Sequence, residues 1–247
     1  MGRSKIATGR VLACLAVGAS LLSACSEPAR VADEATRCAL IIVDMQYDFT
    51  PGGSLAVEDG DQIVGLINDL QGEFDLVVAT QDWHPSDHGS FASNQEGRRP
   101  GEVIQLGGVE QVLWPDHSIQ GSHGAELLAE LDRSRIARIF RKGTDPEIDS
   151  YSGFFDNGKR KATGLGNYLK EEGVSEVYVV GLALDYCVKF TALDAQGLGF
   201  DTTLIEDASR AVNLSPNDGI DAVQAMKDAG IQVVKGAEVL AARTQNR

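Results

Sequence analysis

Short apolar runs bounded by turn residues recur along the chain. Such runs are typical of strands that are covered on both faces of a parallel sheet. The predicted strands lie at residues 39–43, 76–79, 136–140, 177–180, 202–205 and 231–234. Amphipathic stretches separate most of them, at residues 62–71, 125–131, 164–172, 189–196 and 219–229. This alternation predicts a three-layer α/β/α domain with a mostly parallel, six-stranded open sheet and helices on both faces.

The first 25 residues follow a different pattern. A basic start precedes an apolar run over residues 11–22, which is too short to span a bilayer as a permanent helix. The run ends in Leu22-Ser23-Ala24-Cys25. This order is typical of a bacterial lipoprotein export signal, in which Cys25 would accept the lipid.

The leader divides the chain into an export signal at 1–24, a tether at 25–37 and a folded domain at 38–247. We therefore expect an exported protein that meets the membrane only through a lipid anchor. The alternative is a chance apolar leader or a misplaced start, which would leave a cytoplasmic protein.

The composition narrows the range of partners. The 247 residues include 36 acidic and 22 basic ones, a net charge of -14, with no basic stripe that could follow a phosphate backbone. Nucleic acid is therefore not expected as a partner.

The first predicted strand leads into Met45-Gln46-Tyr47-Asp48-Phe49 and not into G-x-G-x-x-G, so a nucleotide cofactor is not expected either. Beyond the leader only Cys38 and Cys187 remain, too few for a disulfide framework.

A carboxylate and two imidazoles fall within seven residues after the second predicted strand, in Asp82-Trp83-His84-Pro85 and the nearby His88. The chain has only four histidines, and a third one, His117, follows Trp114-Pro115-Asp116. An oxygen ligand together with imidazole nitrogens suits zinc, iron or manganese. Because three of the four histidines lie in these short motifs, the sequence favours a metal site over a loop whose histidines only form hydrogen bonds.

Reactive side chains stand at the ends of four predicted strands. Asp44, Asp82 and Lys142 end or follow the first three, and Cys187 follows the fourth after a short turn. Ligands bind at the carboxyl ends of strands in open sheets, so these groups should meet at one edge. An acid, an amine and a thiol suffice for amide hydrolysis through a thioester. We expect Lys142 to lower the pKa of Cys187, and Asp44 to carry the thiol proton to the leaving ammonia.

The turn from Gly181 to Val188 joins a predicted strand to a predicted helix. Backbone N–H groups at such a turn can stabilise an oxyanion, and the amides of Ala183 and Cys187 are the expected donors. Taken alone, Asp44 could equally cap a helix, and Lys142 could equally be a solvated surface residue.

Six motifs follow one another in order between about residues 38 and 234. They are Val43-Asp44-Met45-Gln46-Tyr47-Asp48-Phe49, Asp82-Trp83-His84-Pro85 with His88 and Ser90-Phe91, Trp114-Pro115-Asp116-His117, Arg141-Lys142-Gly143, Tyr151-Ser152-Gly153-Phe154, and Gly181 to Val188. Together they resemble the nicotinamidase/pyrazinamidase family of the isochorismatase-like cysteine hydrolase superfamily. The resemblance implies that residues 38–247 form a metal-dependent amidohydrolase domain. It would convert nicotinamide to nicotinate and ammonia in NAD salvage, through a thioester on Cys187.

The resemblance also implies a role for each motif. The catalytic triad would be Asp44, Lys142 and Cys187. One divalent metal, zinc before iron or manganese, would be held by Asp82, His84 and His117, with His88 as a further candidate ligand. The pyridine ring would lie between Phe49 and Trp114, in a pocket lined by Ala183, Tyr151 and Tyr186. The peptide between Leu182 and Ala183 would be cis.

Several alternatives stay open on the sequence. A carbamoyl or ureido amidohydrolase of the same superfamily uses the same Asp-Lys-Cys set, although such relatives generally lack the complete ligand set. An isochorismatase fits less well, because those enzymes lack the nucleophilic cysteine. A non-catalytic lipoprotein that captures a metal or a pyridine ligand would not need all three catalytic residues. Nicotinamidases are usually cytoplasmic, so the leader departs from the family, and a homo-oligomer is left open.

Overall fold

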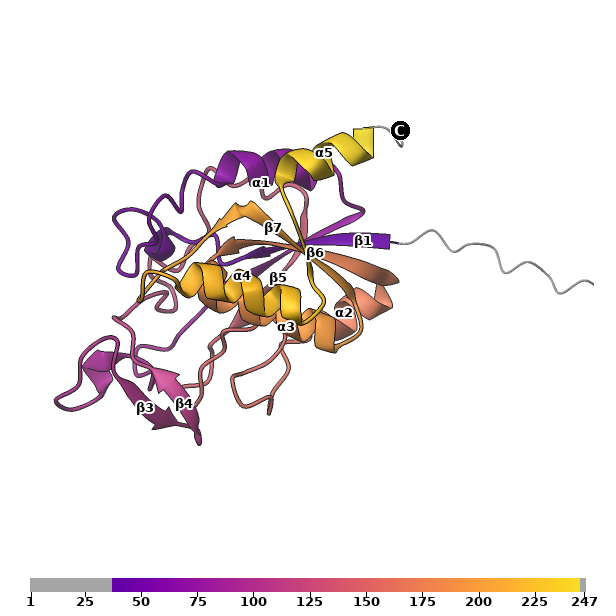
Figure 1. Cartoon of the computed structure of the whole chain (residues 1–247). Coiled ribbons are helices and arrows are strands. Elements are labelled where there is room, and N and C mark those ends of the chain that lie inside the picture. Colours follow the sequence, from indigo (N-terminus) through magenta and orange to yellow (C-terminus); the bar gives the residue numbers. More distant parts are fainter. Residues whose placement is uncertain (1–36, 245–247) are drawn as a thin grey trace, which may run out of the picture. The chain divides into compact units, whose positions relative to one another are not determined.

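The computed structural model describes residues 37–244, and the predicted export signal and nearly all of the predicted tether lie outside the described residues. Within that range the central sheet has six strands, in the order β5-β2-β1-β6-β7-β8 (Figure 1). These strands are β1 (Arg37–Val43), β2 (Leu76–Asp82), β5 (Ile136–Lys142), β6 (Val174–Leu182), β7 (Asp201–Arg210) and β8 (Gln232–Val234). All pairings in this sheet are parallel, which confirms the predicted fold class.

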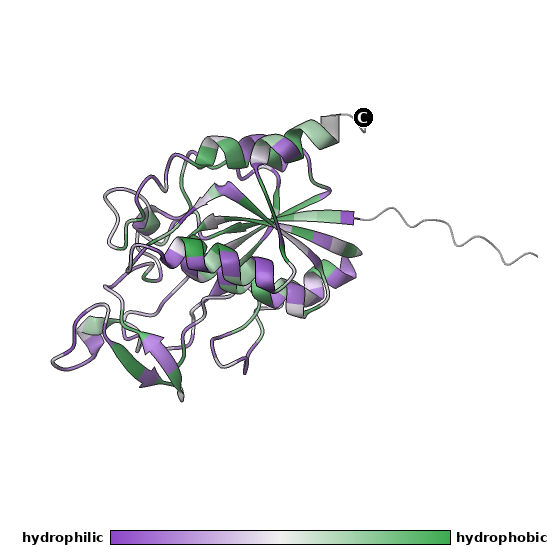
Figure 2. Ribbon diagram, viewed as in Figure 1, coloured by the Kyte–Doolittle hydropathy of each residue, from purple (hydrophilic) through white to green (hydrophobic). Residues whose placement is uncertain are grey.

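Helices cover both faces of the sheet (Figure 1). On one face lie α1 (Val64–Gln71) and α5 (Gly236–Thr244), and on the other lie α2 (Leu165–Glu171), α3 (Lys189–Gly197) and α4 (Asp218–Asp228). Successive residues of β1 point to opposite faces, so Ile41 packs in the core under α2, α3 and α4, while Leu40 and Ile42 pack in the core under α1. Figure 2 shows the resulting pattern, with mainly apolar strands between helices that carry both polar and apolar residues.

The predicted helix at 125–131 is wrong. Much of the backbone there bonds to distant partners: Leu128 N donates to Met45 O at 2.9 Å, and Ala125 O accepts from Gln46 Nε2 at 2.9 Å and from Gln81 Nε2 at 2.8 Å. Ala125, Leu127 and Leu128 are nevertheless buried. The apolar spacing therefore reflects burial of an irregular segment and not a helix.

Two further differences concern the edges of the fold. The strand β5 was expected to be buried, but it lies at the edge of the sheet and Ile139 is 43% exposed. A separate antiparallel hairpin of β3 (Val103–Leu106) and β4 (Val109–Val112) was not predicted, and neither was α5. No helix among residues 37–244 combines the length and the apolar character that a membrane crossing requires.

Candidate active site and metal site

The three predicted catalytic residues meet at the carboxyl edge of the sheet. Asp44 directly follows β1, Lys142 is the last residue of β5, and Cys187 lies in a π-helical turn, η3 (Leu184–Val188), after β6. The Lys142 Nζ atom is 2.8 Å from Asp44 Oδ2 and 3.4 Å from Cys187 Sγ, and it also donates to Ser150 O at 3.0 Å. All three side chains are buried. The lysine therefore stands between the carboxylate and the sulfur, as convergence of the strand ends predicts.

Burial and neighbouring charges together shift the pKa values of the three triad residues. Burial raises the pKa of Cys187, and Asp44, Asp82 and Asp149 raise it further, so the opposing effect of Lys142 leaves that pKa well above its usual value. Lys142 thus lowers the pKa of Cys187 as expected, but burial and the three carboxylates outweigh it. Burial also raises the pKa of Asp44 against the opposing charge of Lys142. Burial lowers the pKa of Lys142, but Asp44 and Asp82 outweigh it and leave that pKa well raised, so the amine is an ammonium.

The turn that carries Cys187 depends on a close approach between two strands. Gly181 has φ +113, and a Cβ atom there would lie 2.1 Å from Val43 O. The peptide between Leu182 and Ala183 is cis, which confirms that expectation. Asp185 fixes the turn from the other side, because its carboxylate accepts the N–H groups of residues 212 and 213 at 2.9 and 2.8 Å.

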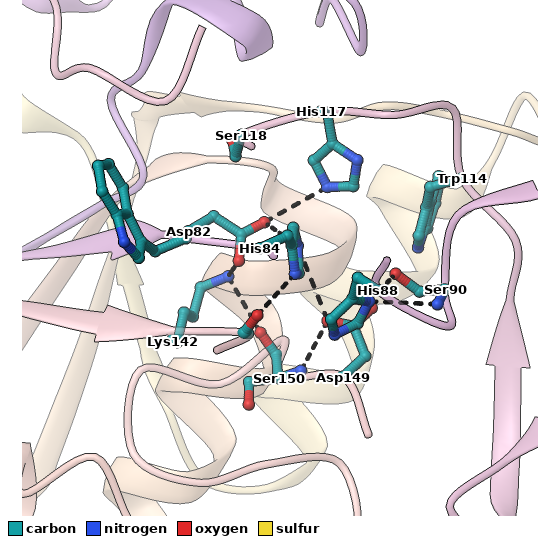
Figure 3. Close-up of polar contacts among 12 residues, drawn as sticks. Asp82, His84, His88, Ser90, Trp114, His117, Ser118, Lys142, Asp149 and Ser150 are labelled. Carbon is teal, nitrogen blue, oxygen red and sulfur yellow. Dashed lines mark hydrogen bonds and ion pairs between the residues drawn. The ribbon is translucent and has the colours of Figure 1, made fainter. Parts of the chain in front are cut away.

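The predicted metal ligands also come together, as Figure 3 shows. Asp82, His84 and His117 each offer one ligand atom, and these atoms lie within 4.8 Å of one another. The His84 Nδ1 atom is 2.8 Å from Gly143 O, and the His117 Nδ1 atom is 2.8 Å from Pro115 O. A backbone carbonyl only accepts hydrogen bonds, so each ring carries a hydrogen on Nδ1 and turns Nε2 toward Asp82.

The distances from Asp82 Oδ2 are 2.9 Å to His84 Nε2 and 3.4 Å to His117 Nε2. Two ring nitrogens aimed at one buried carboxylate need a positive charge between them, either as protons or as a metal ion. Burial opposes ionisation of Asp82, but His84 and Lys142 outweigh it and hold its pKa well below the usual range. Burial likewise opposes protonation of His84, yet Asp82 leaves its pKa raised. The donor set therefore fits a divalent metal.

Asp82 joins the metal site to the triad. While its Oδ2 atom faces the two histidines, its Oδ1 atom accepts a hydrogen bond from Lys142 Nζ at 3.0 Å. One buried carboxylate thus contacts the residues of both sites.

His88 is oriented differently from the other two histidines. Its ring centre lies 4.3 Å from that of His84, and His84, His88 and Asp149 form a second group of ligand atoms within 4.8 Å. Its Nδ1 atom can accept the Ser90 N–H at 3.1 Å when the ring hydrogen is on Nε2, or donate to Ser90 Oγ at 2.7 Å when that hydrogen is on Nδ1. Burial, together with the charge of His84, lowers the pKa of His88 to about 4, so the ring is neutral near pH 7. To bind a metal through Nε2, His88 would donate from Nδ1 to Ser90 Oγ in place of accepting the Ser90 N–H.

The five predicted pocket residues line one small pocket beside the sulfur. Its walls include Phe49, Trp114, Tyr151, Ala183 and Tyr186, together with Asp82, His117, Asp149 and Cys187. The rings pack edge to face, with centroids 4.8 Å apart for Trp114 and Tyr186 and 5.4 Å apart for Tyr151 and Tyr186. A slot of this kind suits a planar ring.

Three buried polar residues at the site were missed in the sequence. Thr80 Oγ1 donates to Asp44 Oδ1 at 2.6 Å, Asp149 lines the pocket, and Gln111 donates to Asp149 Oδ2 at 2.9 Å. Only Asp149 had a signal, since it stands two residues before the motif that begins at Tyr151. Thr80 lies in β2, one residue beyond the predicted strand at 76–79, and Gln111 belongs to the hairpin that was not predicted.

Comparisons with known proteins agree with this geometry. The isochorismatase domain model matches residues 38–238. The nicotinamidase of Escherichia coli is 48% identical over 78% of this chain and 92% of its own length. The structure of an Acinetobacter baumanii nicotinamidase/pyrazinamidase has a TM-score of 0.81 at 47% identity and covers 83% of this chain and 99% of that chain. The structure of the pyrazinamidase of Pyrococcus horikoshii in complex with zinc has a TM-score of 0.66 at 38% identity and covers 81% and 99%. The chain therefore belongs to the isochorismatase family.

Proposed function

We propose that this protein is a nicotinamidase, which hydrolyses nicotinamide to nicotinate and ammonia. One observation carries the proposal: the Lys142 ammonium contacts the Asp44 carboxylate at 2.8 Å and the Cys187 sulfur at 3.4 Å, next to an aromatic slot and a metal-ligand set. The names of the Escherichia coli and Acinetobacter relatives, at 48% and 47% identity, support the same substrate.

The slot and the ligand set bind and orient the substrate. Phe49 and Trp114 hold the pyridine ring, while Tyr151 and Tyr186 close the pocket around it. Asp82, His84 and His117 would hold a divalent metal, and the zinc in the Pyrococcus relative supports zinc as that metal. When bound, the metal supplies a positive charge that attracts the pyridine nitrogen and leaves the carboxamide facing Cys187.

The triad then performs the covalent chemistry. The pKa of Cys187 is raised, which favours the thiol, and Asp44 accepts the thiol proton as Cys187 Sγ attacks the carboxamide carbon. The amides of Ala183 and Cys187 stabilise the oxyanion, and Lys142 remains an ammonium that balances the charge of Asp44. The C–N bond breaks as Asp44 returns the proton to the leaving ammonia. Water, deprotonated by Asp44, cleaves the thioester, which releases nicotinate and restores the thiol.

Ammonia release from nicotinamide by purified protein tests the proposal, with a ureido substrate in parallel to check the alternative activity. We expect Cys187→Ala to abolish hydrolysis and a chelator to suppress it. Cys38→Ala is the matched control, because Cys38 is the other buried cysteine of the described domain. Turnover by Cys187→Ala within a few-fold of the wild-type rate would refute the thioester route.

A further inference from the structure

Gln111 on β4 connects the hairpin to the active site. Its Nε2 atom lies 2.8 Å from Val112 O, 2.9 Å from Asp149 Oδ2 and 2.9 Å from Tyr151 Oη, so its two hydrogens are shared among three acceptors. Its Oε1 atom accepts from Asn157 Nδ2 at 3.2 Å. The side chain is 1% exposed. A carbonyl and a carboxylate can only accept and the Asn157 amide nitrogen can only donate, so these partners fix which end of Gln111 faces the site.

The Tyr151 hydroxyl is consequently left with a free hydrogen. Its oxygen accepts hydrogen bonds from Gln111 Nε2 at 2.9 Å and from Trp114 Nε1 at 3.2 Å. Neither nitrogen can accept a hydrogen bond in return. Burial, reinforced by Asp149, raises the pKa of Tyr151 well above its usual value, so the hydroxyl keeps its hydrogen. Among residues 37–244 the hydrogen bonds of this hydroxyl are these two accepted ones, and Tyr151 borders the same pocket as Cys187.

We propose that Gln111 is a positioning residue that, together with Trp114, makes the Tyr151 hydroxyl a hydrogen-bond donor to the carbonyl oxygen of the bound amide. The inference rests on the proposed nicotinamidase function. Nicotinamide has two strong acceptors, the ring nitrogen, which the metal-ligand set accounts for, and the carbonyl oxygen. When that oxygen becomes an oxyanion it carries three lone pairs, so it can accept from Tyr151 beside the amides of Ala183 and Cys187. A donor aimed at the carbonyl oxygen gains strength as negative charge develops there, so its effect belongs in kcat more than in KM.

The test compares Gln111→Met, Tyr151→Phe and the double variant in steady-state hydrolysis of nicotinamide. Loss of one neutral hydrogen bond should lower kcat by about 3- to 10-fold in each single variant. Because Gln111 acts through Tyr151, the double variant should be no slower than the slower single variant. Gln105→Met is the matched control, since Gln105 is an exposed glutamine on β3 of the same hairpin, and it should keep the wild-type rate.

Ammonia release by the wild-type protein tests the nicotinamidase function separately from the role of Gln111. A wild-type protein that releases no ammonia refutes the nicotinamidase function itself. An active wild type with multiplicative losses in the double variant would show that Gln111 has only an independent structural role, which overturns the inference. If Gln111→Met fails to fold, Tyr151→Phe decides alone, because an unchanged kcat would exclude a donor at Tyr151.

Discussion

The pKa of the buried Asp44 carboxylate depends on its neighbours Thr80 and Lys142. Its Oδ1 atom accepts from Thr80 Oγ1 at 2.6 Å, and its Oδ2 atom lies 2.8 Å from Lys142 Nζ. Burial raises the pKa of Asp44, whereas Lys142 and Thr80 act in the opposite direction. Two contacts, one charged and one neutral, therefore favour the carboxylate form of Asp44 against the effect of burial.

Thr80→Val should shift the acidic limb of the kcat/KM profile to higher pH. The valine cannot donate to Asp44, so the pKa of that carboxyl rises, and a higher pH is needed to form the carboxylate that accepts the thiol proton. A pH profile for nicotinamide hydrolysis measures the shift. Thr80→Ser retains the hydroxyl and should keep the wild-type limb. An unmoved limb in Thr80→Val would exclude Asp44 as the group that titrates there.

His84→Ala should lose both bound metal and nicotinamide affinity, because it removes one of three donor atoms from a buried ligand set. Metal analysis of purified wild type should give about one transition-metal ion per chain. The control is His123→Ala, which should bind metal normally. The His123 side chain is 72% exposed, and among residues 37–244 it contacts Glu126 and the Tyr47 ring. Full metal content in His84→Ala would contradict the assignment.

The sequence predicted which residues meet but not their electrostatics. Strand-end positions were enough to bring together Asp44, Lys142 and Cys187, because parallel strands share one carboxyl edge. The high pKa of Cys187 was not predictable, since it arises from burial and from carboxylates on other elements. The role of Gln111 was not predictable either, because its partners Asp149 and Tyr151 lie 38 and 40 residues away along the chain.

At the scale of elements, the site depends on how closely β6 approaches β1. The missing side chain of Gly181 leaves room for Val43 O, which a Cβ atom would meet at 2.1 Å. Gly181 also has φ +113, a backbone conformation that side chains rarely allow. The next residues form the cis peptide and the turn that carries Cys187, so the pairing of two strands positions the nucleophile.

Gly181→Ala should destabilise the domain by about 3 kcal/mol, since the methyl group overlaps a strand backbone that cannot move away. Urea unfolding measures this loss. Gly65→Ala is the comparison, because Gly65 lies in α1 with open space around it, and we expect it to stabilise the domain by about 0.5 kcal/mol. Equal stability of Gly181→Ala and the wild type would show that β6 can move away from β1.

The sequence predicted all six strands of the central sheet, including the edge strands β5 and β8, which are only partly buried. The apolar runs at 39–43 in β1 and 76–79 in β2 are short and bounded by turn residues, which is typical of strands covered on both faces. The hairpin is only partly buried and interrupts a long loop, although Gly107-Gly108 between two alternating runs was a usable signal. The false helix at 125–131 had helical spacing, but its backbone groups are taken by Met45, Gln46 and Gln81.

For the molecule as a whole, we propose that the domain is exported and lipid-anchored through Cys25. The support is the order of residues 1–25, with basic positions, an apolar run and Leu22-Ser23-Ala24-Cys25. Removal of residues 1–24 would take away three basic residues and no acidic ones, which changes the formal charge from -14 to 19 minus 36, or -17. Stable anchoring needs more than one acyl chain, which a modified lipoprotein cysteine supplies.

Cys25→Ser should block lipidation and leave the protein unanchored or unprocessed. The rate of nicotinamide hydrolysis should not change, because residues 1–25 precede all six catalytic motifs. Cell fractionation measures where the protein is located, and mass spectrometry of the N-terminus measures whether Cys25 is modified. Cys14→Ser is the matched control within the leader. An unmodified chain that starts at Met1 in the cytosol would refute the anchor.

The two oxygens of Asp82 make metal occupancy and thiol reactivity thermodynamically linked. A metal ion held by Asp82, His84 and His117 would offset the charge of Asp82, which raises the pKa of Cys187, and would so favour the thiolate. By reciprocity, an ionised sulfur must strengthen metal binding by the same factor. The alkylation rate of Cys187 should therefore report how full the metal site is, faster in loaded protein than in chelated protein, without any substrate being present.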